Sequence, residues 1–166
     1  QFKDVLLEQG QLAPAGPPQL IFWTDQIKDR KIFSMMSPEP VKVTVPFGLG
    51  AEMIEGRYVF SAQSTSEVEI VAPANSRHIS ATVGLNPAAY DRSDGIEVVI
   101  IYAPAGGGRQ ELYRRYLRPA VVKADQGPQE ISLETTGPMS GSVLFRIQPG
   151  GGPNFDWGYW AKIEVH

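Results

Sequence analysis

The stretch from Gly141 to Val165 constrains the fold more strongly than any other part of the chain. It contains two segments of alternating apolar residues, 143–147 and 157–165, joined by a loop rich in glycine and proline. Alternation with a period of two places one set of side chains on a buried face, and a connection rich in glycine and proline cannot be helical. The end of the chain therefore predicts a β-hairpin.

The same kind of pattern recurs along the chain from Val41 onward. Residues 41–45, 66–71 and 129–134 alternate apolar and polar side chains, which is typical of antiparallel strands with one buried face. Residues 96–102 are almost continuously apolar and predict a central strand covered on both faces. Together these segments predict an all-β protein of about nine to eleven strands, arranged as an antiparallel two-sheet β-sandwich of jelly-roll type.

Some segments are ambiguous. Residues 109–118 fit either a helical stripe or a strand, and the alternating neighbourhood and Pro119 favour a strand. Glu52–Ile54 allows a short helix within a loop, whereas Leu20–Trp23 and Arg30–Met35 allow short strands.

The length and composition indicate one domain. A chain of 166 residues can build one sizeable core, and its 17 glycines and 14 prolines suit short strands with many turns. Residues 1–19 contain three prolines within a short span and predict an extended N-terminal arm or linker, followed by a single domain over residues 20–166.

Charge and composition exclude several classes of function. A net charge of −3 provides no basic field for a phosphate backbone, so nucleic acid is not an expected partner. The absence of cysteine removes disulfides, thiolate nucleophiles and zinc–thiolate sites. The sequence holds no apolar run of the ~20 residues that a membrane-spanning helix needs. Because the chain begins at Gln1 rather than Met, we expect an exported protein that is secreted, periplasmic or on the cell surface.

From about Asn75 onward the sequence resembles a known family. Asp94-Gly95 precedes the apolar strand IEVVIIY, and the last strand begins with an Asp-Trp-x-x-Trp group formed by Asp156, Trp157 and Trp160. These features resemble galactose-binding-like β-sandwiches, and most closely the NPCBM-type carbohydrate-binding modules of bacterial secreted proteins. The resemblance implies a jelly-roll sandwich and a glycan ligand, although many relatives of this sandwich only pack against a neighbouring domain.

The aromatic group Trp157, Tyr159 and Trp160 is one candidate ligand site. The apolar face of a sugar ring can stack on an aromatic side chain, which offers a large and rigid contact. The alternative is that these residues pack in the core or at its edge. In the modules that the chain resembles, this aromatic strand is usually structural.

A basic cluster lies on the segment between Arg109 and Lys123. On a strand, Arg114, Tyr116 and Arg118 share one face, which could bind an acidic sugar, a carboxylate or an anionic protein surface. The alternative is a solvated edge strand that charged residues protect from aggregation.

Four aspartates, Asp91, Asp94, Asp125 and Asp156, fall in predicted loops or beside strand ends. The sandwich family that the chain resembles often holds a structural Ca²⁺ with loop carboxylates, which makes these residues candidate calcium ligands. Calcium needs six to eight oxygen ligands, and Asp-Gly is also a common turn dipeptide, so ordinary turns are the competing interpretation. No cofactor other than this calcium ion is expected.

No catalytic motif is present in the sequence. The two histidines, His78 and His166, match no spaced metal motif, and the glycine runs follow neither phosphate-loop nor dinucleotide patterns. We therefore expect a noncatalytic, exported carbohydrate-binding module. The alternative is a structural or protein-interaction domain of a larger assembly, which could be membrane-associated.

Overall fold

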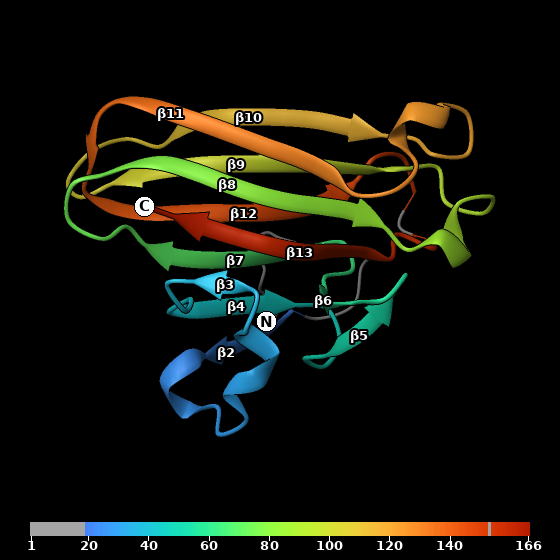
Figure 1. Ribbon diagram of the computed structural model, residues 1–166, viewed down its shortest axis with the longest axis horizontal. Coiled ribbons are helices and arrows are strands. Elements are labelled where there is room, and N and C mark those ends of the chain that lie inside the picture. The colour runs from blue at the N-terminus through green and yellow to red at the C-terminus, as the bar shows by residue number, and fades with distance from the viewer. Residues whose placement is uncertain (1–18, 153) are drawn as a thin grey trace, which may run out of the picture.

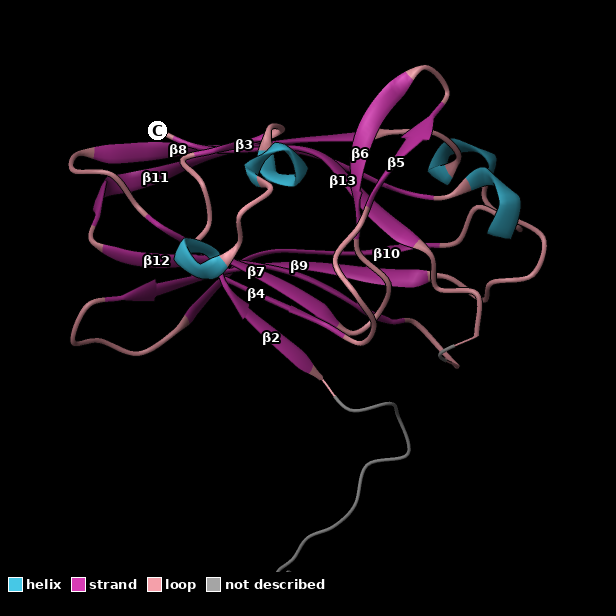
Figure 2. Ribbon diagram, turned by 90° about the horizontal axis from the view of Figure 1, so that it is seen from below, coloured by secondary structure: helices cyan, strands magenta, loops and turns pink. Residues whose placement is uncertain are grey.

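The structure is a computed structural model that describes residues 19–152 and 154–166. These residues form twelve strands and four short 3₁₀ helices, and the strands make two sheets stacked face to face (Figure 2). The antiparallel two-sheet β-sandwich predicted from the sequence is confirmed, with slightly more strands than the nine to eleven expected. The predicted arm of residues 1–19 lies outside the described residues except for Gln19.

The first sheet has six strands, and all of its neighbouring strands are antiparallel. In spatial order they are β10 (Gln110–Leu117), β9 (Ile96–Pro104), β12 (Gly141–Pro149), β7 (Ser66–Val71), β4 (Lys42–Val45) and β2 (Leu20–Trp23). Strands β10 and β2 are therefore its edges.

The second sheet packs over the first (Figure 2). Its order is β11 (Gln129–Met139), β8 (Ser76–Leu85), β13 (Gly158–Val165), β6 (Arg57–Ser61) and β5 (Ala51–Ile54), and the short β3 (Met36–Ser37) pairs in parallel with β13. The 3₁₀ helices are η1 (Thr24–Gln26), η2 (Arg30–Phe33), η3 (Pro87–Ala89) and η4 (Lys123–Asp125).

Two local expectations are wrong. Glu52–Ile54 belongs to strand β5, not to a helix, because Glu55 and Gly56 both have positive φ and form a tight turn that leads back into β6. Arg30–Phe33 forms η2 instead of a strand, because the Asp29 side chain caps it by accepting a hydrogen bond from the Lys31 amide at 3.2 Å. The strand expected over 109–118 is confirmed as β10.

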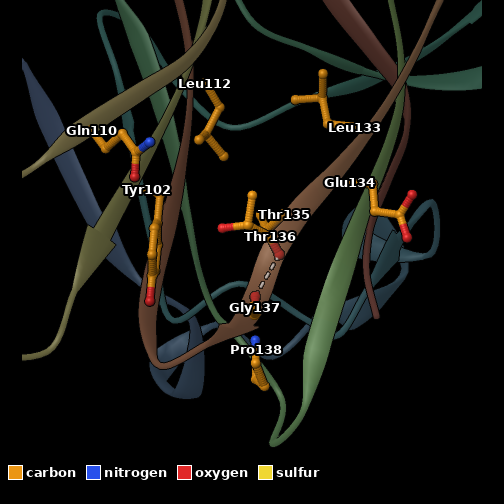
Figure 3. Close-up of a pocket in the computed structure, with 9 residues that line it drawn as sticks. All are labelled: Tyr102, Gln110, Leu112, Leu133, Glu134, Thr135, Thr136, Gly137 and Pro138. Carbon is orange, nitrogen blue, oxygen red and sulfur yellow. Dashed lines mark hydrogen bonds between the residues drawn. The ribbon is translucent and has the colours of Figure 1, made fainter.

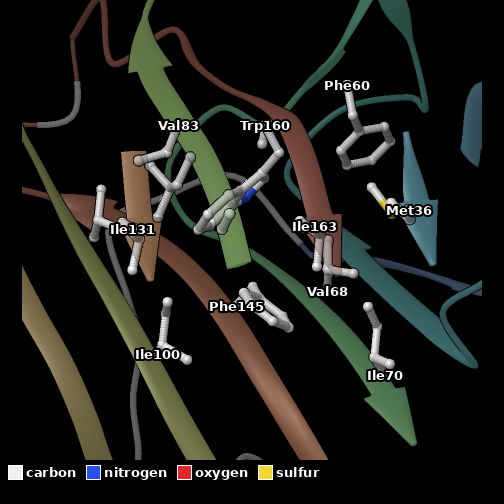
Figure 4. Packing of buried hydrophobic residues seen from close by; sticks show 14 of the residues in the cluster. Met36, Phe60, Val68, Ile70, Val83, Ile100, Ile131, Phe145, Trp160 and Ile163 are labelled. Atoms are coloured by element: carbon white, nitrogen blue, oxygen red, sulfur yellow. The ribbon is translucent and has the colours of Figure 1, made fainter. Parts of the chain in front are cut away.

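The core lies between the two sheets, as the close-up in Figure 4 shows. Trp160 is fully buried at its centre and contacts Phe145 edge to face, with ring centroids 5.6 Å apart. Aromatic pairs in this geometry stabilise a core beyond the area that they bury.

A β-bulge decides which aromatic residues of β13 enter this core. The pairing with β8 shifts between Trp160 and Lys162, so Ala161 is an extra residue in β13. The bulge puts Trp160 on the same side as the buried Ile163, whereas Tyr159 and Ala161 pack in a separate cluster. Simple alternation, which groups Trp157 and Tyr159 with Ile163, is therefore wrong for this strand.

Strand β9 is buried on both faces, as expected. Val98 and Ile100 point into the main core, while Val99 and Ile101 form a second apolar cluster with Leu144 on the outer face. No helix in the described part of the chain is long and apolar enough to cross a membrane.

Candidate functional site

Three connections meet at one end of the sandwich, on the right of Figure 1, where η3 and η4 lie. They are the β8–β9 loop (86–95), the β10–β11 loop (118–128) and the described residues of the β12–β13 loop (150–152 and 154–157). The Asn86 amide donates to the Trp157 carbonyl at 2.8 Å, and the Gly127 amide donates to the Tyr90 hydroxyl at 2.7 Å. These hydrogen bonds join segments that are distant in sequence into one surface, which we call the loop end.

A cation and two aromatic rings form the centre of the loop end. The guanidinium carbon of Arg92 lies 4.5 Å from the ring centroid of Phe155 and 5.7 Å from that of Trp157. The two rings are 5.6 Å apart and tilted by 59°. Arg92 is exposed and both rings are half-buried, so solvent reaches a surface that combines aromatic faces with hydrogen-bond donors. We call these three residues the loop-end cluster.

The buried carboxylate of Asp156 holds this cluster in place. Its Oδ1 accepts a hydrogen bond from the Ser93 hydroxyl and its Oδ2 accepts one from the Ser64 hydroxyl, both at 2.9 Å. Burial raises the pKa of Asp156 to about 6, because desolvation outweighs these two hydrogen bonds and the nearby Asp94 charge acts in the same direction. Asp156 therefore ties together two other loops beside the rings of its sequence neighbours.

Tyr116 and Arg118 lie at the same end of the sandwich. The Tyr116 hydroxyl donates to the carbonyl of Asp94, and the guanidinium carbon of Arg118 is 5.5 Å from the Tyr116 ring centroid. Tyr116 also supports the β12–β13 loop, since a Cβ on Gly150 would lie only 2.1 Å from its ring. Both side chains remain exposed, so they can flank a ligand that contacts the loop-end cluster.

Arg114, predicted to face an anionic ligand, is already paired. Its guanidinium donates to Glu111 at 2.8 Å and contacts Glu97 at 2.5 Å. Hydrogen bonds to these two carboxylates raise its pKa above the usual range for arginine. These two carboxylates balance the positive charge of Arg114, which weakens its attraction for an anionic ligand.

Trp160 and Tyr159 do not lie on the ligand-accessible surface. Trp160 is 0% exposed and Tyr159 is 2% exposed, so neither ring can stack on a sugar in this structure. Tyr159 packs with Ile54 and Val59, and burial raises its pKa to about 12. The core-packing alternative is correct for both residues, and only Trp157 of the predicted aromatic group reaches solvent.

The four predicted calcium ligands do not gather into one group. Asp125 Oδ1 accepts from Arg115 and its Oδ2 accepts from the Arg118 amide, both at 2.8 Å. Both carboxylate oxygens of Asp156 accept from serines, whereas Asp94 accepts from the Gly152 amide. Asp91 is exposed. Within residues 19–152 and 154–166, no three acidic or histidine side chains are placed to hold a metal ion.

Arg92 and Phe155 are the site residues that the sequence reasoning missed. Phe155 directly precedes the Asp156-Trp157 pair, and Arg92 lies two residues before Asp94. The sequence feature that could have indicated them is an arginine in one loop and an aromatic residue in another, each loop being rich in turn-forming residues. Their juxtaposition depends on the folding of both loops, so no sequence spacing reports it.

A cavity of about 360 Å³ opens elsewhere, between the edge strands β10 and β11 of the two sheets (Figure 3). The Tyr102 ring forms one wall, fixed because its hydroxyl donates to the Ser140 carbonyl and accepts from the Ser140 amide. Leu112 and Leu133 form an apolar part of the lining, and Thr135 hydrogen-bonds to Gly137 at the rim. The cavity can hold a small, largely uncharged molecule, but it contains none of the sequence-predicted site residues.

Comparisons with known proteins show similarity of fold. No protein-family model and no curated protein matches the sequence. Among solved structures, the M60 catalytic domain with the CBM51-1 and CBM51-2 domains of Clostridium perfringens ZmpB matches with a TM-score of 0.54 at 11% identity. The CBM51-2 and INT domains of the same protein match with a TM-score of 0.53 at 12% identity.

These matches are partial on the side of the known structures. They cover 76% and 74% of this chain, but only 14% and 29% of the two longer chains in those structures. At this level of identity they establish the architecture, and they agree with the two sheets described above. The chain therefore shares the two-sheet β-sandwich architecture of these structures.

Proposed function

We propose that this protein is a noncatalytic carbohydrate-binding module that holds a glycan at its loop end. The fold likeness to CBM51 domains supports the class of function. The observation that carries the proposal is the loop-end cluster, in which an exposed arginine and two half-buried aromatic rings meet at the end of that fold.

The geometry suits a sugar ring. The C–H face of a sugar is apolar and packs on Phe155 or Trp157, while its hydroxyls accept hydrogen bonds from the Arg92 guanidinium. Tyr116, Arg118 and Asp94 flank this contact and offer further donors and acceptors. A site of this kind combines apolar area with a few oriented polar groups, as small-ligand sites generally do.

The position of the Asp156 carboxylate suits support of a binding site better than catalysis. Glycosidases use two carboxyl groups on either side of the scissile bond, one of them as a proton donor. Asp156 is 2% exposed and accepts hydrogen bonds from two serines, so it cannot reach a glycosidic oxygen without rearrangement. We propose that the module acts outside the cytoplasm, which its resemblance to modules of secreted proteins supports.

The proposal is tested with a glycan array, followed by isothermal titration calorimetry of the best ligand. Replacing Trp157 with alanine should weaken binding at least tenfold, since truncating a contact aromatic costs more than about 1.4 kcal/mol. Tyr58→Ala is the matched control, because Tyr58 is 64% exposed but lies on β6, outside the loop end. Equal affinities for Trp157→Ala and the wild type would refute this site.

A protein-interaction domain is the second candidate function. The observation that favours it is an exposed apolar pair on the β5–β6 hairpin, where Met53 and Tyr58 face each other across the two strands and are 58% and 64% exposed. Strand β5 is a sheet edge, and such edges can pair with another chain. A blank glycan array, together with a partner whose binding is lost in Tyr58→Ala, would favour this function.

A further inference from the structure

Another cavity lies beside β2, η1 and η2, the blue segments at the bottom of Figure 1, away from η3 and η4. Its volume is about 380 Å³, within the range of small-ligand sites. It is lined by Trp23, Thr24, Asp25, Arg30, Glu39 and the Pro40–Val41 segment. All of these residues precede Asn75, where the family resemblance begins.

Trp23 provides an aromatic platform in this cavity. It ends the edge strand β2, where it pairs with Lys42 of β4, and it is 51% exposed. The Lys42 ammonium lies 5.4 Å from the ring centroid and 3.6 Å from a carboxylate oxygen of Glu69, so its charge is balanced within the sheet. Half of a tryptophan surface left in water is costly, and burying it is a frequent source of binding energy.

Arg30 is oriented before any ligand arrives. Its Nη1 donates to the Thr24 carbonyl at 2.6 Å, and its Nη2 is paired with Glu39. A guanidinium carries five N–H donors in a plane, so these contacts fix its orientation and leave donors for a ligand. Glu39 and Asp25 supply acceptors around the same cavity.

Thr24 adds a hydroxyl that has no partner. It is 2% exposed, and within the described part of the chain its Oγ1 makes no hydrogen bond. Leaving a buried hydroxyl unsatisfied is unfavourable. Because Oγ1 itself is buried, a polar ligand in the adjoining cavity would satisfy it after a shift of the cavity lining.

We propose that this cavity binds a neutral saccharide residue, stacked on Trp23 and hydrogen-bonded by Arg30, Glu39 and Thr24. An aromatic face next to fixed donors and acceptors matches the apolar C–H face and the hydroxyls of a sugar. The lining contains two carboxylates and one guanidinium. Its net negative charge therefore repels an acidic sugar. The inference extends the proposed carbohydrate binding to a second surface and does not require the loop end to bind.

The test uses the full chain labelled with 5-fluorotryptophan. The protein has three tryptophans, so its ¹⁹F spectrum has three signals, which Trp23→Phe and Trp157→Phe assign. The probes are the methyl glycosides of glucose, galactose and N-acetylglucosamine, with glucuronic acid as the charged counterpart. We expect a saturable shift of the Trp23 signal with at least one neutral probe and at least tenfold weaker binding of glucuronic acid, while the buried Trp160 signal stays constant.

The three signals separate this inference from the proposed function. A shift of the Trp157 signal alone overturns the second site and supports binding at the loop end. A shift of the Trp23 signal alone supports the second site and argues against binding of these sugars at the loop end. The absence of any shift refutes the second site, while the loop end is judged with the array-derived glycan. Glucuronic acid binding as tightly as glucose overturns the neutral-sugar assignment.

Two variants complete the test of the cavity. Thr24→Val removes the unpartnered hydroxyl at nearly constant shape and should weaken sugar binding several-fold without lowering thermal stability. Trp23→Ala should weaken it at least tenfold, whereas the exposed control Tyr58→Ala leaves it unchanged. Unchanged sugar affinity in both cavity variants would overturn the proposal. A partner protein that binds at the cavity and is displaced by no sugar would also overturn it.

Discussion

Protonation of Asp156 should govern how the stability of the protein depends on pH. The folded state raises the pKa of this buried carboxyl from 3.8 to about 6. A raised pKa means that the folded state prefers the protonated form, so the stabilisation is present below pH 3.8 and is lost as the pH rises through 6. Each pKa unit corresponds to about 1.4 kcal/mol, which gives a total effect of about 3 kcal/mol.

The substitution Asp156→Asn isolates this effect, because asparagine keeps an acceptor but cannot ionise. The free energy of unfolding of the variant minus that of the wild type should increase by about 3 kcal/mol as the pH rises from 3.5 to 7.5. For a chain of this size that gain corresponds to about 6–12 °C in melting temperature. Urea denaturation of both proteins across this pH range measures the difference, and other titrating groups cancel in the comparison.

A free-energy difference between Asp156→Asn and the wild type that does not vary with pH would refute the reasoning. A difference that falls as the pH rises would contradict the sign of the pKa shift. Asp94→Asn is the comparison variant, because asparagine keeps an acceptor for the Gly152 amide while the charge that helps to raise the pKa of Asp156 is removed. Its pH dependence should therefore be smaller than that of the wild type but should not vanish.

Three further predictions concern packing and metal. Trp160→Ala should cost about 3–5 kcal/mol of folding free energy, since it empties the centre of the core; a loss below 1 kcal/mol in urea denaturation would contradict that burial. Gly84→Ala should destabilise by about 1–3 kcal/mol, because its Cβ would lie 2.5 Å from the Tyr159 hydroxyl, and thermal unfolding that matches the wild type would argue against this contact. The melting temperature should be the same in millimolar CaCl₂ as in EDTA, because Asp125 and Asp156 already accept hydrogen bonds. A melting temperature several degrees higher in CaCl₂ would support the calcium hypothesis.

The sandwich could be predicted from the sequence because its signal is local. Alternation in residues 66–71 and 129–134, and the apolar run of 96–102, correspond to strands β7, β11 and β9. Such patterns report which side of a strand is buried without any knowledge of its partners. The two strands expected at the C-terminus are present as β12 and β13. The predicted hairpin is wrong, because β12 pairs with β7 and β9 in one sheet and β13 pairs with β6 and β8 in the other.

Long-range pairing decided what could not be predicted. The bulge at Ala161 exchanges the faces of Trp160 and Tyr159, and it is visible only once β13 is aligned with β8. Glu52–Ile54 lacks a clear alternating pattern, and its pairing with β6 makes it a strand. The expected short strand Arg30–Met35 is wrong for a local reason instead, since the cap at Asp29 outweighs a loose alternation.

The candidate site was predicted in part. Trp157, Arg118 and Asp94 lie in the three loops that meet at one end of the sandwich, and Tyr116 lies near the end of strand β10 beside Asp94 and Arg118. Arg114 shares a strand with Tyr116 but is paired with two glutamates, and strand spacing alone does not reveal those partners. Arg92, Phe155 and the cavity beside Trp23 depend on loop conformations that no periodic pattern encodes.

The most direct test of the central claim is calorimetric titration of the wild type and Trp157→Ala with the strongest ligand from a glycan array. The account predicts saturable binding of a glycan to the wild type and an affinity at least tenfold lower for the variant, with both proteins equally folded. Glycan binding that is unaffected by Trp157→Ala would place the site elsewhere. A wild type that binds no glycan on the array would contradict the proposed function.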